Sequence, residues 1–293
     1  MTKRQQLRIL LQGPDILVAP GAYDGGTAMM VQRAGFAAVY MTGAGVSLTY
    51  GLPDYGLLTM TEMASHAGTM AGAVGIPLIA DADTGYGNEL NVTRTVTEYE
   101  ARGIAALQIE DQVSPKRCGH LAGKEVIPRE DFVSKIRAAV AARRDPDLVL
   151  IARTDARAVI GMDEAVARAN AALDAGADVA FLEAATSVEE AASVPRLVHG
   201  PCLLNMVLNG VTPVMDVRQA QEMGYRVAIQ PAILFATMVA RGMEALAALS
   251  ATHKHPPVPG DLTMEDVFRH VGSERWDRLR VLGPVLAKVP HAA

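Results

Sequence analysis

Short apolar segments alternate along most of the chain with segments in which apolar residues recur every three or four positions. The short segments have the length and composition of buried parallel strands, and the longer ones have the period of amphipathic helices. The expected strands are residues 16–20, 38–41, 77–81, 106–110, 148–153, 179–183, 202–205 and 226–230. The expected helices include residues 61–73, 91–102, 129–143, 162–175 and 214–223.

This alternation of strand and helix predicts parallel pairing through right-handed crossovers. Eight such units predict an α/β fold, a (β/α)8 TIM-type barrel, over residues 1–250. The alternative is a doubly wound open sheet, which usually carries the pattern G-x-G-x-x-G after its first strand. Residues 21–26 read Gly-Ala-Tyr-Asp-Gly-Gly and lack that pattern, so we expect the barrel.

Two connections are much longer than the others, residues 42–60 after the second expected strand and residues 111–128 after the fourth. In a barrel both would lie at the carboxyl ends of the strands, where active sites are built. We therefore expect two long loops on that face, each a candidate lid over the substrate.

Residues 251–293 are expected to form a separate C-terminal segment. It opens with a proline-rich stretch at residues 253–260, which is typical of a stiff linker. Two further helical patterns, residues 263–271 and 273–287, exceed what eight barrel units need. Such helices pack on a neighbouring subunit or on their own barrel, and both alternatives stay open.

Composition and charge exclude several classes of protein. Half of the residues are hydrophobic and 20% are charged, which excludes a disordered chain. The formal net charge of -5 argues against nucleic acid or an anionic membrane surface as a partner. No continuous apolar run approaches the roughly 18 residues that span a bilayer, residues 1–12 lack the features of a signal peptide, and two cysteines make no disulfide scaffold. We therefore expect a soluble, cytoplasmic protein with no membrane partner.

Polar residues gather at the carboxyl ends of the expected strands, where a purely structural barrel would carry small or apolar ones. Because the ends of all eight strands meet at one face, we expect these side chains to surround an active site. They are Tyr40, Thr42, Asp81, Asp83, Glu110, Arg153, Glu183, Asn205 and Gln230.

Asp81 and Asp83 form an acidic pair at alternate positions, so both carboxylates can face the same way. Oxygen ligands without nearby His or Cys suit a hard ion, Mg²⁺ or Mn²⁺, rather than zinc. Glu110 and Asp54 are expected to complete the coordination directly or through water. Asx turns produce the same spacing and are the alternative explanation.

The second long connection contains the run Lys116-Arg117-Cys118-Gly119-His120. Three side chains that can carry positive charge surround one thiol, which should favour the thiolate and make Cys118 an acid/base group or a nucleophile. The alternatives are zinc ligation and an incidental surface cysteine. Cys202 lies in an apolar strand and is expected to be inert.

Arg153, at the end of the fifth strand, can pair with a substrate carboxylate or alkoxide, or form a structural ion pair with Glu110 or Glu183. No strand ends in Lys, which disfavours a Schiff-base aldolase, and no H-x-H pair supplies a zinc site. The seventh and eighth strands are not followed by a Gly-Gly phosphate cradle. The expected substrate is therefore a small carboxylate.

Taken together, these motifs resemble those of the isocitrate lyase/phosphoenolpyruvate mutase superfamily, over residues 8–250. The run at residues 116–120 is the signature of its lyase branch. The supporting runs are residues 40–46, 81–87, 109–112, 152–156 and 183–184.

The resemblance implies a Mg²⁺-dependent carbon–carbon lyase that cleaves a 2-hydroxy di- or tricarboxylate to pyruvate or glyoxylate and a second carboxylate. It implies that Cys118 protonates the departing half and that Arg153 stabilises the developing oxygen anion. The full expected sets are Cys118, Tyr40, His120, Arg153 and Glu110 for catalysis; Thr42, Gly43, Ala44, Gly119, Arg153, Glu183 and Asn205 for the substrate; and Asp81, Asp83, Asp54 and Glu110 for the metal. It also implies a homotetramer that exchanges C-terminal helices.

Residues 205–213, which bear on the choice of substrate, depart from the family's patterns. Asn205, Met206 and the apolar Leu208 favour an alkyl-substituted dicarboxylate such as 2,3-dimethylmalate over 2-methylisocitrate. The alternatives are an oxaloacetate decarboxylase and a phosphoenolpyruvate or carboxyphosphonoenolpyruvate phosphonomutase; a barrel retained only for binding is a further one. The run at residues 116–120 argues against the phosphonate enzymes.

Overall fold

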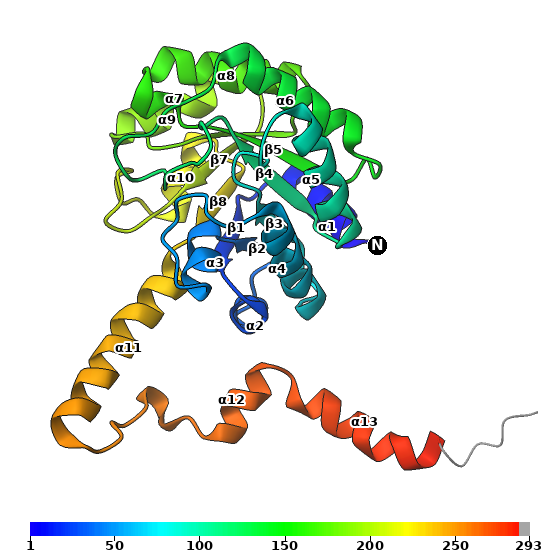
Figure 1. Cartoon of the computed structure of the whole chain (residues 1–293), viewed down its shortest axis with the longest axis vertical. Coiled ribbons are helices and arrows are strands. Elements are labelled where there is room, and N and C mark those ends of the chain that lie inside the picture. The colour runs from blue at the N-terminus through cyan, green and yellow to red at the C-terminus, as the bar shows by residue number, and fades with distance from the viewer. Residues whose placement is uncertain (287–293) are drawn as a thin grey trace, which may run out of the picture. The chain divides into compact units, whose positions relative to one another are not determined.

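A computed structural model describes residues 1–286 of the chain. Eight parallel strands pair in chain order, and the eighth pairs with the first, so the sheet is a closed barrel (Figure 1). The (β/α)8 barrel predicted from the sequence is therefore confirmed. The strands are β1 (Leu17–Ala22), β2 (Val39–Met41), β3 (Leu78–Asp81), β4 (Ala106–Glu110), β5 (Val149–Thr154), β6 (Val179–Leu182), β7 (Cys202–Asn205) and β8 (Val227–Gln230).

Helices surround the barrel in Figure 1. They are α1 (Lys3–Gln12), which precedes β1, and α2 (Gly25–Arg33), α3 (Gly43–Thr49), α4 (Met60–Ala73), α5 (Glu89–Ala101), α6 (Arg129–Ala142), α7 (Ala156–Val159), α8 (Met162–Asp174), α9 (Val188–Leu197) and α10 (Val217–Met223). A further helix, α11 (Ile233–Thr252), follows β8. The later elements are the 3₁₀ turn η1 (Pro259–Asp261), α12 (Met264–His270) and α13 (Ser273–Leu286).

The first long connection is not the open loop that we expected from the sequence, because it contains α3. Thr42 begins this helix by accepting a hydrogen bond from Gly45 N at 3.4 Å. A small capping residue directly after a strand is enough to start a short helix, whatever the apolar pattern. The second connection, residues 111–128, has no helix and is held by one antiparallel bridge between Gln112 and Val126. We call it the β4–α6 loop.

The amino end of the barrel is closed by α1. Leu7 from this helix packs with Leu17, Ile79 and Phe181 in the cluster of side chains that fills the barrel. Arg4 and Arg8 donate hydrogen bonds to the carbonyl oxygens of residues 104 and 148, at 2.9 Å in each case. The opposite, carboxyl end is therefore the end at which the connecting loops build a site.

The chain forms two compact units, Met1–Met238 and Val239–Ala293, and α11 runs from one into the other. Helices α12 and α13 agree with the two helical patterns expected after the linker, and Ala287, the last residue of the second, lies outside the described residues. The domain boundary at residue 250 and the packing of this segment on a neighbouring subunit stay predictions.

One helix of the described part, α11, is long and apolar enough to cross a membrane by length and composition, with a mean hydropathy of 1.4. No continuous apolar run marks this helix in the sequence, because Arg241 and Glu244 interrupt its apolar residues. A single such helix is a weak indication, and the absence of a membrane partner stays a prediction.

The seam between β1 and β8 predicts a strong effect of one substitution. A Cβ atom on Gly21 would overlap the backbone of Pro231, which cannot move aside as a flexible side chain could. We expect Gly21→Ala to lower the free energy of unfolding by about 3 kcal/mol, measured by urea denaturation.

Gly72 is the matched control, because it lies in α4 and a Cβ atom there would meet no other atom within 4 Å. Gly72→Ala should raise the free energy of unfolding by up to about 1 kcal/mol, since alanine favours a helix over glycine. Equal stabilities of the two variants would contradict this description of the seam.

Candidate active site

A cavity of about 80 Å³ lies at the carboxyl ends of the strands. Most of the residues that the sequence singled out line it: Tyr40, Thr42, Ala44, Asp54, Asp81, Cys118, Gly119, His120, Arg153, Glu183 and Asn205. The rest of the lining is Lys116, Val207, Ile229, Pro231, Ala232 and Phe235. The loop thiol and the acidic strand ends therefore face the same small space.

Four residues expected at the site do not line this cavity, and one of them, Gln230, lines the second cavity described below. Gly43 lies against Asp81, whose Oδ2 accepts a hydrogen bond from Gly43 N at 3.3 Å; a Cβ atom on Gly43 would come within 2.6 Å of that oxygen. Asp83 and Glu110 are buried, and the peptide of Glu110 donates to the carbonyl oxygen of Asp83 at 2.9 Å. Gly43 thus allows the close approach of α3 to β3, and the two acids support the site from beside it.

Lys116 links the acidic residues to one another. Its ammonium group pairs with Asp54 and lies 3.1 Å from Asp83 Oδ1. Asp81 is held differently, since its Oδ1 accepts from the peptide of Asp83 at 3.0 Å and from the amide of Gln108 at 3.3 Å. Tyr40 in turn donates its hydroxyl to Gln108 at 3.0 Å. Each carboxylate is therefore fixed by its own partners.

Burial makes two of the acids, Asp83 and Glu110, hard to ionise. Burial raises the pKa of Asp83 to about 6; Lys116 opposes the shift, and the charges of Asp81 and Asp54 add to it. Burial also raises the pKa of Glu110 well above its ordinary value, although Arg153 and Lys116 counteract it. The cluster therefore contains carboxyl groups that its own cations do not fully stabilise in the ionised form.

The residues present fit a hard divalent cation. Asp83 Oδ1 and Glu110 Oε1 are buried and have no hydrogen-bond partner, although Lys116 Nζ forms an ion pair with the first at 3.1 Å. Unsatisfied carboxylate oxygens are the ligands that Mg²⁺ prefers, usually one or two of them with water completing the shell.

The four carboxylates expected to hold a metal, directly or through water, do not converge on one point, and their part in metal binding stays a prediction. Across residues 1–286 no three acidic, His or Cys side chains converge closely enough to coordinate one ion. The physical reason is Lys116, whose ammonium group lies between Asp54 and Asp83. An ion here would rely on few protein ligands and on water or substrate oxygens.

Arg153 is surrounded by carboxylates. Its Nε lies 3.0 Å from Asp155 Oδ2 and 3.3 Å from Glu110 Oε2, and its Nη2 lies 3.9 Å from Glu183 Oε2. The guanidinium group also stacks over Phe181, 5.0 Å from the ring centre. The geometry agrees with both alternatives for Arg153: it forms ion pairs with acids of the chain, and it also lines the cavity, where it can contact a substrate.

The thiol of Cys118 is half-buried on the β4–α6 loop, and the expectation of a thiolate is wrong. Burial raises the pKa of Cys118, and the charge of Asp54 adds to the shift, while Lys116 and Arg153 counteract it too weakly. The neighbours in sequence are engaged elsewhere, Lys116 with acids and Arg117 over the ring of Tyr55. Cys118 is thus a protonated thiol that can give a proton.

His120 is held in one tautomer by its partners. Its Nδ1 accepts a hydrogen bond from Val211 N at 3.1 Å, so the proton resides on Nε2, which lies 3.2 Å from Glu183 Oε1. The amide of Asn205 also donates to Glu183, at 3.2 Å. The side-chain oxygen Oδ1 of Asn205 is buried and accepts no hydrogen bond from the protein, so it can accept one from a ligand.

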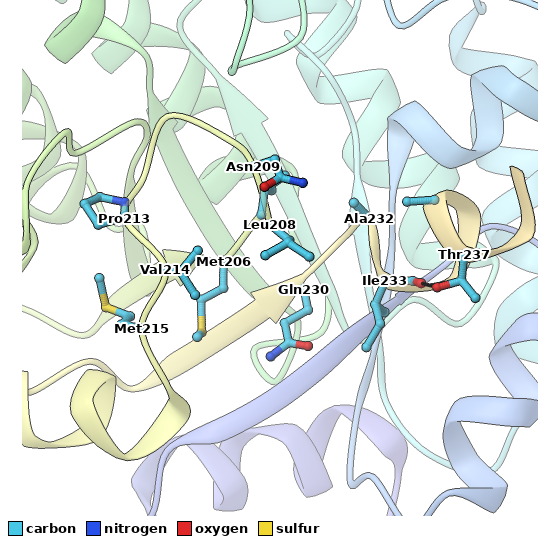
Figure 2. A pocket seen from close by; sticks show the side chains of 12 residues that line it. Met206, Leu208, Asn209, Pro213, Val214, Met215, Gln230, Ala232, Ile233 and Thr237 are labelled. Atoms are coloured by element: carbon cyan, nitrogen blue, oxygen red, sulfur yellow. Dashed lines mark hydrogen bonds between the residues drawn. The ribbon is translucent and has the colours of Figure 1, made fainter. Parts of the chain in front are cut away.

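The segment after β7 faces a second cavity of about 370 Å³, shown in Figure 2. Met206, Leu208 and Gln230 line it, and Leu208 is 72% exposed. The residue of this segment that lines the catalytic cavity is Val207. Leu208 therefore does not line the catalytic cavity, and the apolar contact there comes from Val207, which lines both cavities.

Four residues of the site were missing from the expected sets. They are Lys116, Gln108, Lys124 and Asp155, of which Lys116 and Asp155 belong to motifs of the sequence without having a role assigned to them. Lys124 pairs with Asp155 at 3.0 Å. The sequence does indicate a role for Asp155, because this residue follows Arg153 by two positions. It does not indicate one for Lys124, because a lysine in a loop is usually exposed.

Comparisons with known proteins agree with this geometry. The family model described as phosphoenolpyruvate phosphomutase matches residues 7–250. A 2,3-dimethylmalate lyase of Eubacterium barkeri is 48% identical over 232 residues, covering 79% of this chain and 80% of that protein. A 2-methylisocitrate lyase of Aeropyrum pernix is 48% identical over 229 residues, which cover 78% of this chain and 74% of that protein.

Solved structures are similar over nearly the whole chain. Oxaloacetate acetylhydrolase with the inhibitor 3,3-difluorooxalacetate has a TM-score of 0.92 at 39% identity, covering 97% of each chain. A 2,3-dimethylmalate lyase in a trigonal crystal form has a TM-score of 0.91 at 43% identity, and the match covers 95% of this chain and 94% of that chain. Phosphonopyruvate hydrolase with oxalate and Mg²⁺ has a TM-score of 0.86 at 31% identity, and the match covers 96% of this chain and 99% of that chain.

The contacts of His120 predict its behaviour on titration. Burial lowers its pKa, the charges of Arg153 and Lys124 add to this, and Glu183 opposes it. We expect ¹⁵N spectra of histidine-labelled protein to show a neutral ring with the proton on Nε2 at pH 6.5, the signal being assigned by its loss in His120→Gln. An imidazolium signal at that pH would contradict the assignment.

Proposed function

Since this chain belongs to the phosphoenolpyruvate mutase/isocitrate lyase superfamily, we propose that it is a carbon–carbon lyase that cleaves an alkyl-substituted 2-hydroxy dicarboxylate such as 2,3-dimethylmalate. The products would be pyruvate and a second carboxylate. The observation that carries the proposal is that Cys118, Arg153 and the acidic cluster line one cavity. The 2-methylisocitrate lyase reaction is the second candidate, because a relative of that name is equally identical.

The lining supports the smaller, more apolar substrate. Val207, Ile229 and Phe235 give the cavity apolar contacts that suit alkyl groups. Its two permanent cations, Lys116 and Arg153, are already paired with acids of the chain. A third carboxylate on the substrate would therefore find no unpaired Lys or Arg among the residues that line the cavity.

The reaction places negative charge first on the C2 oxygen and then, as the bond breaks, on C3. Cleavage of the bond between C2 and C3 turns the C2 hydroxyl into the carbonyl of the keto acid, and its proton leaves to the acidic cluster. Arg153 stabilises the oxygen as charge develops there. We assign the keto-acid carboxylate to Thr42 and Ala44, beside Gly43, and the other carboxylate to His120, Glu183 and Asn205.

Cys118 completes the reaction by protonating the carbanion left on C3. A thiol whose pKa is raised is protonated near neutral pH, and it is still a far stronger acid than the carbon acid that it neutralises. Gly119 lets the loop approach closely, since a Cβ atom there would overlap the guanidinium group of Arg153. The half-buried thiol is thus delivered by the loop rather than by the barrel.

We propose that a divalent cation, Mg²⁺ or Mn²⁺, is held by Asp81 and supported by Asp83 and Glu110. When bound, it would neutralise the substrate carboxylate and act as a Lewis acid toward the developing oxygen anion. The support is the pair of buried carboxylate oxygens without donors and the Mg²⁺ in the phosphonopyruvate hydrolase structure. Asp54, paired with Lys116, would contribute through water.

We further propose a cytoplasmic homotetramer. The support is the family resemblance and the apolar surface of α11, on which Met243 and Leu246 are 63% and 61% exposed. A subunit contact is the usual reason for such a surface on a metabolic enzyme.

A substrate panel with Mg²⁺ tests the function. Wild-type enzyme should cleave 2,3-dimethylmalate faster than 2-methylisocitrate, with pyruvate detected as a product of both. Cys118→Ser should lower kcat by about 10²- to 10⁴-fold, because the hydroxyl is a much weaker acid than the thiol.

Cys202→Ala is the matched control, since the chain has two cysteines and Cys202 is buried in β7. It should keep the wild-type kcat. Faster turnover of 2-methylisocitrate would assign the second candidate function. Decarboxylation of oxaloacetate at an undiminished rate in Cys118→Ser would overturn the lyase mechanism.

A further inference from the structure

We propose that Lys124 is a positioning residue that fastens the β4–α6 loop over the cavity and, in doing so, releases part of the charge of Arg153 for the substrate. Its effect on turnover rests on the lyase function proposed above. Its effect on the loop does not, and can be measured without substrate.

Lys124 ties the loop to the barrel at two points. Its side chain is 3% exposed, and its ammonium group donates a hydrogen bond to the carbonyl oxygen of Gly119, within the same loop. The same group lies 3.0 Å from Oδ1 of Asp155, which directly follows β5. The turn that carries Cys118 and His120 is thereby attached to the end of a strand.

Asp155 is the shared partner of Lys124 and Arg153. Its Oδ2 accepts from Arg153 Nε at 3.0 Å, and its Oδ1 accepts from Arg153 Nη2 at 3.3 Å as well as contacting Lys124. The peptide of Asp155 donates to Asp111 at 2.9 Å, and its side chain is fully buried. Asp155 is therefore fixed, and only the cations around it can change.

Sharing one carboxylate between two cations changes what Arg153 can do. With the loop closed, Lys124 takes part of the negative charge of Asp155, and Arg153 keeps more positive charge toward the cavity. With the loop open, Lys124 leaves and Asp155 neutralises Arg153 alone. Because charges interact strongly in a buried site, closure would switch on the stabilisation of the oxygen anion.

Steric contact couples the same elements. A Cβ atom on Gly119 would overlap Arg153 Nη2 and lie 2.9 Å from Glu183 Cγ, so the loop backbone rests against both side chains. The hydrogen bond from Lys124 holds this segment of backbone in place. Lys124 therefore sets the position of Arg153 as well as its charge, without lining the cavity.

The loop is tested by the alkylation rate of Cys118 with iodoacetamide, followed by peptide mass spectrometry. Burial raises the pKa of the other cysteine, Cys202, to about 12, so Cys118 is the thiol that reacts. Lys124→Met should increase the rate about tenfold, because the loop opens more often. Lys124→Arg should stay near wild type.

Turnover separates positioning from simple structural support. Lys124→Met should lower kcat about 10²-fold and change KM less than about threefold, since Lys124 does not touch substrate. Lys124→Arg should recover most of this loss. Lys3→Met is the matched control, because Lys3 also donates to a backbone carbonyl, that of Ala71, but at α1; it should change neither rate.

Asp155→Asn tests the shared carboxylate. If Lys124 acts through Asp155, adding Lys124→Met to Asp155→Asn should cost far less than the 10²-fold of the single change. An alkylation rate of Lys124→Met equal to wild type, or fully additive losses in kcat, would overturn the proposal. Absence of lyase turnover in wild type would instead refute the proposed function, and the alkylation rates would still decide the role of Lys124.

Discussion

The site depends on an excess of carboxylates at the mouth of the barrel. Asp54, Asp81, Asp83, Glu110, Asp155 and Glu183 surround it, and the permanent cations among them are Lys116, Lys124 and Arg153. Buried carboxylates are costly unless they are paired, so they hold these three cations tightly. They would also repel a dicarboxylate. A bound divalent cation would offset both the cost of burying the carboxylates and their repulsion of the substrate.

The barrel produces this excess by geometry. Each acid except Asp54 lies at or just beyond the end of a strand, and closure of the sheet brings those ends together. Close approach is then achieved by glycine, at Gly43 against Asp81 and at Gly119 against Arg153. The β4–α6 loop adds two of the cations, Lys116 and Lys124, and the thiol of Cys118, so movement of this loop would change the charge balance and the access to the cavity together.

Much of this arrangement could be predicted from the sequence, because strand ends are fixed by periodicity. The barrel, the acidic strand ends and the loop thiol followed from that alone. The ionisation of Cys118 could not, since burial and the charge of Asp54, which is distant in the sequence, raise its pKa against the opposing effect of its neighbour Lys116. The orientation of Leu208 and the partners of Lys124 depend on loop conformation, which no apolar pattern encodes.

The most direct test of the charge excess is the binding of Mn²⁺ alone, measured by electron paramagnetic resonance on the full-length protein. The account predicts one saturable site per chain that Mg²⁺ competes for, with affinity lowered at least about tenfold by Asp81→Asn and unchanged by Asp131→Asn at an exposed position of α6. No saturable binding, or binding that Asp81→Asn leaves intact, would contradict it.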